Sequence, residues 1–351
     1  MNNDFSSAKK LRAPSHSMRS MAGLSLVELM ISVALGLIIL AAVTSIFVNT
    51  SASRNEIERT SRQIENGRYA VELLSDDLRM AGFFGELNVA TVAAPGAVPS
   101  ACATAIADLQ AAIPLHLQGY PGGTGAPSCV PAIKTGTDIA VVRRVRACTA
   151  GVAGCPGAVN GRPYLQVSLC DTEAPATPYV LGLEGTATYS LRIRTCGTAL
   201  AGKRQYLTNI YFVSDNNGAG QNVPTLKRLE FTGSGFTETP LVEGIEFFRI
   251  SYGIDTDGDG LPDVYTPDPA NYVCATCTPV ENWRNVVTAK IAVLARNIDT
   301  SPGYIDAKTY NLGLDAAGNP IVVGPFNNAY RRHVYTSLIR VVNPAGRRDT
   351  P

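Results

Sequence analysis

The sequence predicts an α+β fold, in which a long N-terminal transmembrane and amphipathic helix packs on an antiparallel β-sheet head. Three observations predict it: one apolar segment near the N-terminus, a heptad-spaced apolar pattern directly after it, and a series of strand-like runs in the rest of the chain. The chain has 351 residues, is 45% hydrophobic and carries a formal net charge of +1. This charge balance argues against a nucleic-acid binder, and the apolar content argues against disorder.

The apolar segment covers residues 24–48 and contains a single charge, that of Glu28. A helix rises ~1.5 Å per residue and needs about 20 apolar residues to cross a bilayer, so this segment is long enough to span one. Residues 1–23 form a polar leader in which basic residues outnumber the one acidic residue, Asp4. This excess of positive charge predicts a cytoplasmic N-terminus, with the chain beyond Val48 exported.

The junction between leader and apolar segment reads Gly-Leu-Ser-Leu-Val-Glu-Leu-Met over residues 23–30. This string resembles the prepilin cleavage and N-methylation motif of type IV pilins and type II secretion pseudopilins. The resemblance implies that a prepilin peptidase cuts after Gly23 and that Leu24, where Phe is commoner in the family, becomes the methylated N-terminus. It also implies that Glu28 docks the subunit by pairing with an N-terminal amine. The residues alone also fit a signal anchor whose Glu28 snorkels to the headgroups.

Residues 49–84 extend the predicted helix beyond the membrane. Ile57, Ile64, Val71 and Leu78 recur at intervals of seven, with charged residues on the other faces, and Leu74 supplements them. This pattern predicts one apolar stripe that packs on the head, in a helix that runs to about residue 80 and stops at Gly82. A signal-anchor stalk or a coiled-coil spacer would show the same stripe.

Several further stretches resemble the PilW group of minor pilins. Residues 65–70 read ENGRYA and residues 78–85 read LRMAGFFG, a run in which Phe83 and Phe84 are expected to hold the helix end to the head. Later stretches with the same resemblance are 242–246, 252–255, 283–287 and 331–332. The resemblance therefore covers residues 19–85 and 225–343 and implies a pilin-like fold.

Residues 85–351 are predicted to form the exported head. Its first part, residues 86–136, is rich in Ala, Gly, Pro and Thr and is expected to form surface loops. Alternating apolar and polar runs then predict strands at 138–145, 189–193, 206–213, 225–231, 244–254, 285–294 and 331–342.

All eight cysteines follow the membrane segment, which favours structural disulfides formed in an oxidising compartment. They are Cys102, Cys129, Cys148, Cys155, Cys170, Cys196, Cys274 and Cys277. Spacing leaves the connectivity open, and the short-range pairs 148–155, 170–196 and 274–277 are the ones we expect. The CxxC at 274–277 also fits a redox or a zinc pair, although the flanking pattern for either is missing.

An acidic loop at residues 255–263 is the sharpest motif of the head. Asp255, Asp257, Asp259 and Asp263 supply carboxylates at loop positions 1, 3, 5 and 9, and Leu261 supplies a backbone carbonyl at position 7. Oxygen ligands at this spacing predict a weak calcium site, because Thr266 replaces the usual glutamate at position 12; Asp268 is a possible substitute. A solvated Asp-Gly hairpin turn is the alternative interpretation.

The function expected from these features is that of a minor pilin in type IV pilus assembly or priming, and through it in motility or adhesion. No catalytic motif is found, so we expect no enzymatic activity and no cofactor other than calcium. Expected partners are other minor pilins, the major pilin, the prepilin peptidase and the inner-membrane assembly platform, and no nucleic acid. The expected location is the bacterial inner membrane with the head in the periplasm, then the pilus. Alternatives are a type II secretion pseudopilin and a membrane-anchored, calcium-dependent periplasmic adhesin.

Overall fold

The computed structural model describes residues 23, 25–274 and 277–346. The leader residues 1–22 and Leu24, the predicted first mature residue, lie outside them. The chain divides into two compact units, residues 1–55 and residues 56–351, which are described separately below.

The predicted N-terminal helix is observed as α1 (Leu26–Arg79), which contributes to both units. Among the described residues it is the helix that is long and apolar enough to cross a membrane, judged by length and composition. The chain leaves the helix at Gly82, whose φ of 72° is in the left-handed region that glycine adopts without strain. The amide of Gly82 donates to the carbonyl of Arg143 (3.0 Å), so the turn after the helix is held by the head.

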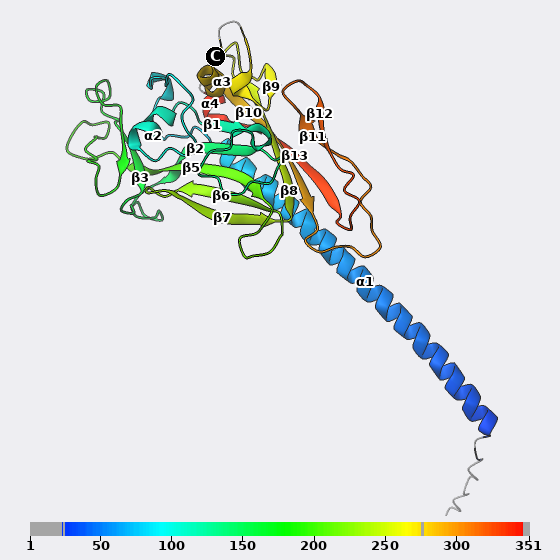
Figure 1. Cartoon of the computed structure of the whole chain (residues 1–351). Coiled ribbons are helices and arrows are strands. Elements are labelled where there is room, and N and C mark those ends of the chain that lie inside the picture. The colour runs from blue at the N-terminus through cyan, green and yellow to red at the C-terminus, as the bar shows by residue number, and fades with distance from the viewer. Residues whose placement is uncertain (1–22, 24, 275–276, 347–351) are drawn as a thin grey trace, which may run out of the picture. The chain divides into compact units, whose positions relative to one another are not determined.

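The described residues of the second unit form an α+β head, as predicted, with two larger antiparallel sheets, a separate two-stranded hairpin and short helices (Figure 1). The helices after α1 are η1 (Val89–Thr91), α2 (Ile106–Ala112), η2 (Pro121–Gly123), η3 (Pro269–Asn271), α3 (Pro279–Arg284) and α4 (Val342–Gly346). The strands are β1 (Leu117–Tyr120), β2 (Ile139–Thr149), β3 (Pro163–Val167), β4 (Tyr179–Leu183), β5 (Lys203–Ser214), β6 (Thr225–Phe231), β7 (Phe236–Glu243), β8 (Ile245–Ile254), β9 (Val264–Thr266), β10 (Val286–Arg296), β11 (Tyr310–Leu314), β12 (Pro320–Val323) and β13 (Arg332–Arg340).

The larger sheet has seven strands, with β5 at its centre pairing with β2 on one side and with β3 and β6 on the other. The smaller sheet has the order β13-β10-β8-β9, and the hairpin β11–β12 forms a separate pair. The main hydrophobic cluster joins the inner faces of both sheets to α1 and includes Tyr252, Trp283 and Ile291. The core of the head therefore lies between the two sheets and the second half of α1.

Two of the predictions for the head are wrong. Residues 189–193 form no strand: the amide of Leu191 donates to the side chain of Gln166 (3.0 Å), and its carbonyl accepts from Ala201 (2.8 Å), so this segment is bound in a loop. Residues 86–136 are not all surface loops either. They contain α2 and β1, and Ile113 and Leu115 are fully buried.

The predicted stripe of α1 is also only partly correct. Leu74 and Leu78 are buried, but Ile57 is 66% exposed and Ile64 is 39% exposed. The buried side of the helix consists instead of what we call the anchoring face, which comprises Gln63, Gly67, Ala70, Leu74 and Leu78. At Gly67 a β-carbon would stand 2.2 Å from the ring of Tyr335, so any larger residue would force this ring to move.

Asp138 connects the two sheets at the start of β2. Its carboxylate accepts hydrogen bonds from the amides of Gly122 (2.7 Å) and Ile250 (2.8 Å) and forms an ion pair with Arg249 (2.9 Å). Burial raises the pKa of Asp138 to about 6, against the opposing effect of Arg249. Sequence reasoning did not identify this residue, because two of its three partners, Arg249 and Ile250, lie more than a hundred positions away in β8.

Four disulfides hold the loops of the head, and they leave no cysteine free among the described residues. They are Cys102–Cys129, Cys148–Cys155, Cys170–Cys196 and Cys274–Cys277. The last three are the short-range pairs that were expected from the sequence.

The contact at Gly67 gives a first prediction. In the full chain in detergent, Gly67→Ala is expected to lower the stability of the head by about 1–3 kcal/mol, because the added methyl group must displace the Tyr335 ring. The matched control is Ser61→Ala at an exposed position of the same helix. Thermal unfolding followed by near-UV circular dichroism measures both, and equal melting temperatures would contradict the close-approach argument.

Candidate functional site

The candidate residues of the N-terminal unit lie at the start of α1. Gly23 is exposed, and Glu28 is the acidic residue of the first helical turn and is also exposed. The hydroxyl of Ser32, one turn further on, donates to the backbone carbonyl of Glu28 (2.7 Å). This hydrogen bond does not involve the Glu28 carboxylate. A carboxylate thus stands at the N-terminal end of an otherwise apolar segment.

The predicted acidic loop, residues 255–263, connects β8 to β9. Asp255 is fully buried, and its two carboxylate oxygens accept from the amides of Gly258 (2.6 Å) and Gly260 (3.0 Å). Asp263 accepts from both the amide (2.7 Å) and the hydroxyl (2.6 Å) of Thr256, and these hydrogen bonds lower its pKa. Backbone and hydroxyl donors of the loop thus stabilise the carboxylates in a hairpin between strands, without flanking helices.

The structure brings together three of the four carboxylates that are predicted to bind calcium. Asp255, Asp257 and Asp263 each offer a carboxylate oxygen within 4.8 Å of the other two, a spacing at which they could hold a metal ion. Asp259 is not part of this group, and its side chain accepts from the amide of Leu261 (2.7 Å). Asp268 does not replace the missing position 12, because its carboxylate accepts from Asn271 (2.7 Å) outside the group.

Polar side chains of α1, from Glu56 onward, bind the strand ends of the head. Glu56 pairs with Arg331 and accepts from the hydroxyl of Ser301 (2.8 Å). One turn later Arg59 donates to the carbonyl of Thr300 (2.9 Å), and Gln63 donates to that of Ala295 (2.9 Å). These contacts fix the register of the helix against the end of β10.

Two of the stretches that resemble PilW meet at the helix. Asn66, in the ENGRYA stretch, donates to the backbone carbonyl of Glu243 (3.0 Å) in the stretch 242–246. Gly244 follows with a φ of 79°, and its carbonyl accepts from the amide of Arg296 (2.8 Å). The two motifs, far apart in the sequence, therefore form a single contact between the helix and the turn from β7 to β8.

Asp77 forms the second polar anchor of the helix and is 5% exposed. Its carboxylate binds the guanidinium of Arg144 (2.5 Å), the amide of Asn209 (2.8 Å) and the hydroxyl of Tyr211 (2.7 Å). Three donors leave neither oxygen of this buried carboxylate without a hydrogen bond. Asp77 therefore joins the helix to β2 and β5.

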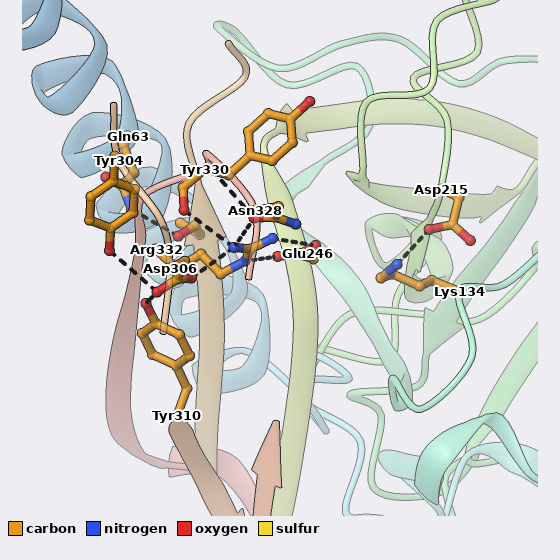
Figure 2. A network of polar contacts seen from close by, with 11 residues as sticks. Gln63, Lys134, Asp215, Glu246, Tyr304, Asp306, Tyr310, Asn328, Tyr330 and Arg332 are labelled. Carbon is orange, nitrogen blue, oxygen red and sulfur yellow. Dashed lines mark hydrogen bonds and ion pairs between the residues drawn. The ribbon is translucent and has the colours of Figure 1, made fainter. Parts of the chain in front are cut away.

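Arg332 forms a buried ionic network at the start of β13 (Figure 2). Its fully buried guanidinium pairs with Glu246 of β8 and with Asp306 (2.8 Å), and it lies 3.8 Å from the centroid of the Phe326 ring. Asp306 also accepts from the hydroxyls of Tyr310 (2.8 Å) and Tyr304 (3.3 Å). The network links three segments that are distant in sequence.

The charges of this network stabilise one another. Burial alone would raise the pKa of Asp306, but hydrogen bonds from Arg332 and Tyr310 lower it below the usual value. Likewise, burial alone would lower the pKa of Arg332, but its bonds to Glu246 and Asp306 raise it. Both groups stay ionised at neutral pH, which makes the network structural rather than a proton-transfer site.

Sequence reasoning singled out the closing Arg331-Arg332 pair only as part of a resemblance. The structure separates the two: Arg332 is buried in the network, whereas Arg331 is partly exposed and pairs with Glu56. Asp77 and Asp306 were missed altogether. Nothing in the sequence around either residue indicates its partners, which the fold brings together from distant segments.

These features define a class of protein: an N-terminal apolar helix continues into the core of an antiparallel α+β head that is held by disulfides. A family model described as Type IV Pilus-assembly protein W matches residues 210–343, from the middle of β5 into α4. Residues 210–343 are therefore similar to the PilW family of type IV pilus-assembly proteins. The match does not extend to residues 19–85, where the cleavage-motif resemblance remains a prediction.

Other comparisons add little. A solved structure that matches is a type IV-like pilin from Thermus thermophilus, with 13% sequence identity and a TM-score of 0.27 over 61% of this chain and 81% of that one. A superposition this loose carries no argument about function. No curated protein matches the sequence.

The Arg332 network gives a second prediction. Arg332→Ala is expected to cost about 3–5 kcal/mol, because it leaves two buried carboxylates unpaired. The neighbouring Arg331→Ala breaks a partly exposed pair and should cost at most about 1 kcal/mol. Urea unfolding of the full chain in detergent, followed by fluorescence of the single, buried Trp283, compares the two. Equal losses in the two variants would be inconsistent with the buried network.

Proposed function

We propose that the chain is a minor pilin that takes part in assembly or priming of the type IV pilus, and thereby in motility or adhesion. The observation that carries the proposal is the match of residues 210–343 to a pilus-assembly family. The N-terminal apolar helix with an acidic residue in its first turn supports it, because a subunit that is stored in a membrane and then packed into a filament needs such a segment.

The proposal includes processing and location. A prepilin peptidase removes residues 1–23 and methylates Leu24, and the subunit waits in the inner membrane with its head in the periplasm. There it joins other minor pilins and the major pilin on the assembly platform. The four disulfides of the head are consistent with an oxidising compartment, and this role requires no enzymatic activity.

Glu28 is the residue on which docking depends in this proposal. An ionised carboxylate in an apolar bundle is stable only when paired, here with the free amine of a neighbouring subunit. A pseudopilin of a type II secretion system would use the same N-terminal design. The family match to pilus assembly favours the pilus.

The third prediction concerns this residue. Glu28→Ala is expected to lower the amount of the subunit in sheared filaments on the order of a hundredfold, because the loss of the buried ion pair costs ~3 kcal/mol. The amount of the subunit in the membrane fraction should stay unchanged. Ser32→Ala, an uncharged change one turn away, is the control. Immunoblots of both fractions give the ratio, and intact mass reports whether the chain begins at methylated Leu24.

Normal incorporation of Glu28→Ala into filaments would contradict the docking role. A chain that keeps residues 1–23 in cells with prepilin peptidase would contradict the whole pilin pathway.

We further propose that the acidic loop binds calcium weakly. Asp255, Asp257 and Asp263 support this, because three carboxylate oxygens within 4.8 Å repel one another and suit an oxygen-seeking cation. Leu261 would add its carbonyl and Asp259 a ligand through water. The hydrogen bonds within the loop satisfy the carboxylates in part, which is consistent with weak rather than tight binding.

The fourth prediction is a calcium affinity of about 10⁻⁴–10⁻³ M for the full chain in detergent, measured by isothermal titration calorimetry. Asp257→Asn should weaken binding by about tenfold, since it removes one charged ligand. Asp315→Asn is the matched control, because Asp315 accepts amide hydrogen bonds in an exposed turn of its own. Absence of heat at millimolar calcium would rule out the site.

A further inference from the structure

β13 lies at one end of the smaller sheet and pairs only with β10 among the described strands (Figure 1). The orientation of its peptide groups follows from two hydrogen bonds just beyond its ends. The amide of Val341 donates to Val287 (2.8 Å), and the amide of Asn297 donates to Arg331 (3.0 Å). Both residue pairs continue the register of the β10–β13 ladder, which has no shift along its length.

Hydrogen-bonded and non-hydrogen-bonded pairs alternate along an antiparallel ladder. Because residues 331 and 341 bond toward β10, the odd-numbered residues between them also bond toward β10. The even-numbered residues therefore direct their amides and carbonyls to the opposite side. Within the described part of the chain, the outward amides and carbonyls of Val334, Thr336 and Leu338 form no backbone hydrogen bond with another segment. We call this row the free edge of β13.

Two other edge strands of the head, β7 and β9, are protected in ways that β13 is not. β7, at the edge of the larger sheet, has eight residues, including Pro240, and a register shift against β6. β9 has only three residues. β13 has nine residues, no proline and no bulge, and Leu338 on it is 62% exposed. A long, regular and unprotected edge is a template for pairing with another strand.

The charges around the start of β13 indicate what kind of strand fits. A pocket of about 330 Å³ lies there between α1 and β13, and its lining includes Arg68, Lys308 and His333. All three side chains are exposed, and none forms an ion pair with another described residue. The two arginines that also line the pocket, Arg331 and Arg332, are already paired with Glu56 and with Glu246 and Asp306, which leaves the charges of Arg68 and Lys308. Unneutralised positive charge therefore remains at one end of the free edge.

We propose that the free edge of β13 binds an extended strand of a different pilin-type subunit, and that this strand carries a carboxylate that enters the pocket at Arg68 and Lys308. A second copy of β13 is a poor occupant, because this strand contains no acidic residue that could supply the carboxylate. The proposal rests on the proposed function, which supplies a neighbouring subunit.

The test uses the full chain in cells. Thr336→Pro removes one outward amide while leaving the odd-numbered bonds to β10 in place, and proline is tolerated on edge strands. Thr336→Ala, which removes the same side chain and keeps the amide, is the matched control. Thr336→Pro is expected to reduce the recovery of other pilin subunits with the tagged chain by about tenfold, while Thr336→Ala retains them.

The pocket is tested separately by charge reversal. Lys308→Glu combined with Arg68→Glu should reduce the same recovery, whereas Arg62→Glu on the same helix, where Arg62 pairs with Glu58, should not. A photo-crosslinker at position 336 should form adducts with one pilin subunit, mapped to an extended segment that bears an acidic residue. Adducts with β13 of a second copy would overturn the choice of partner.

Hydrogen exchange of the wild-type chain tests the free edge of β13 even if the Thr336→Pro variant does not fold. In the wild-type full chain, amides within residues 333–340 should exchange slowly in the assembled complex and faster in the isolated subunit, by at least about tenfold for the outward amides. Unchanged exchange in a complex that does contain the chain would refute the free-edge proposal and leave the proposed function intact. A wild-type chain that recovers no pilin subunit, and behaves like Glu28→Ala in sheared filaments, would refute both.

Discussion

The close contact between the second half of α1 and the smaller sheet is the constraint on which the head depends. Gly67 provides it by leaving room for the Tyr335 ring, and Ala70 on the next turn is fully buried. Small residues let the backbones approach, and the hydrogen bonds of Gln63 and Asn66 to strand-end carbonyls then become possible. A helix packed through large apolar residues alone would stand further from the sheet and lose both bonds.

The polar anchors explain why so many charges lie inside this head. Asp77, Asp138 and Arg332 each join elements that share no sequence neighbourhood, and each is paired and hydrogen-bonded. Such groups add little net stability compared with apolar residues, but an alternative packing would leave them buried and unpaired, which is costly. They therefore select one arrangement of helix and sheets, which suits a subunit whose surfaces must match its neighbours.

The sequence was informative where the signal is local. The membrane-length helix, the principal strands, the end of α1 near Gly82 and the acidic loop follow from periodicity, glycine and spacing within short windows. The anchoring face was misjudged because Ile57 and Ile64 continue the heptad, although the head approaches the helix along Gln63 and Gly67 instead. The buried ionic groups could not be predicted, since Glu246, Asp306 and Arg332 are brought together only by the fold.

The distribution of charge differs between the interior of the head and the surface beside β13, where we propose that a partner binds. Arg332 and Arg331 are neutralised by carboxylates of this chain, whereas Arg68 and Lys308, which line the same pocket, form no ion pair with another described residue. The buried ion pairs already fix the packing of the head. The unpaired charges beside the free edge of β13 are therefore not needed for folding. The free edge of β13 adds backbone donors and acceptors at the same place. Shape, hydrogen-bonding capacity and charge thus coincide at β13, which explains why specificity for a neighbouring subunit would reside on this strand rather than on the protected edge of β7.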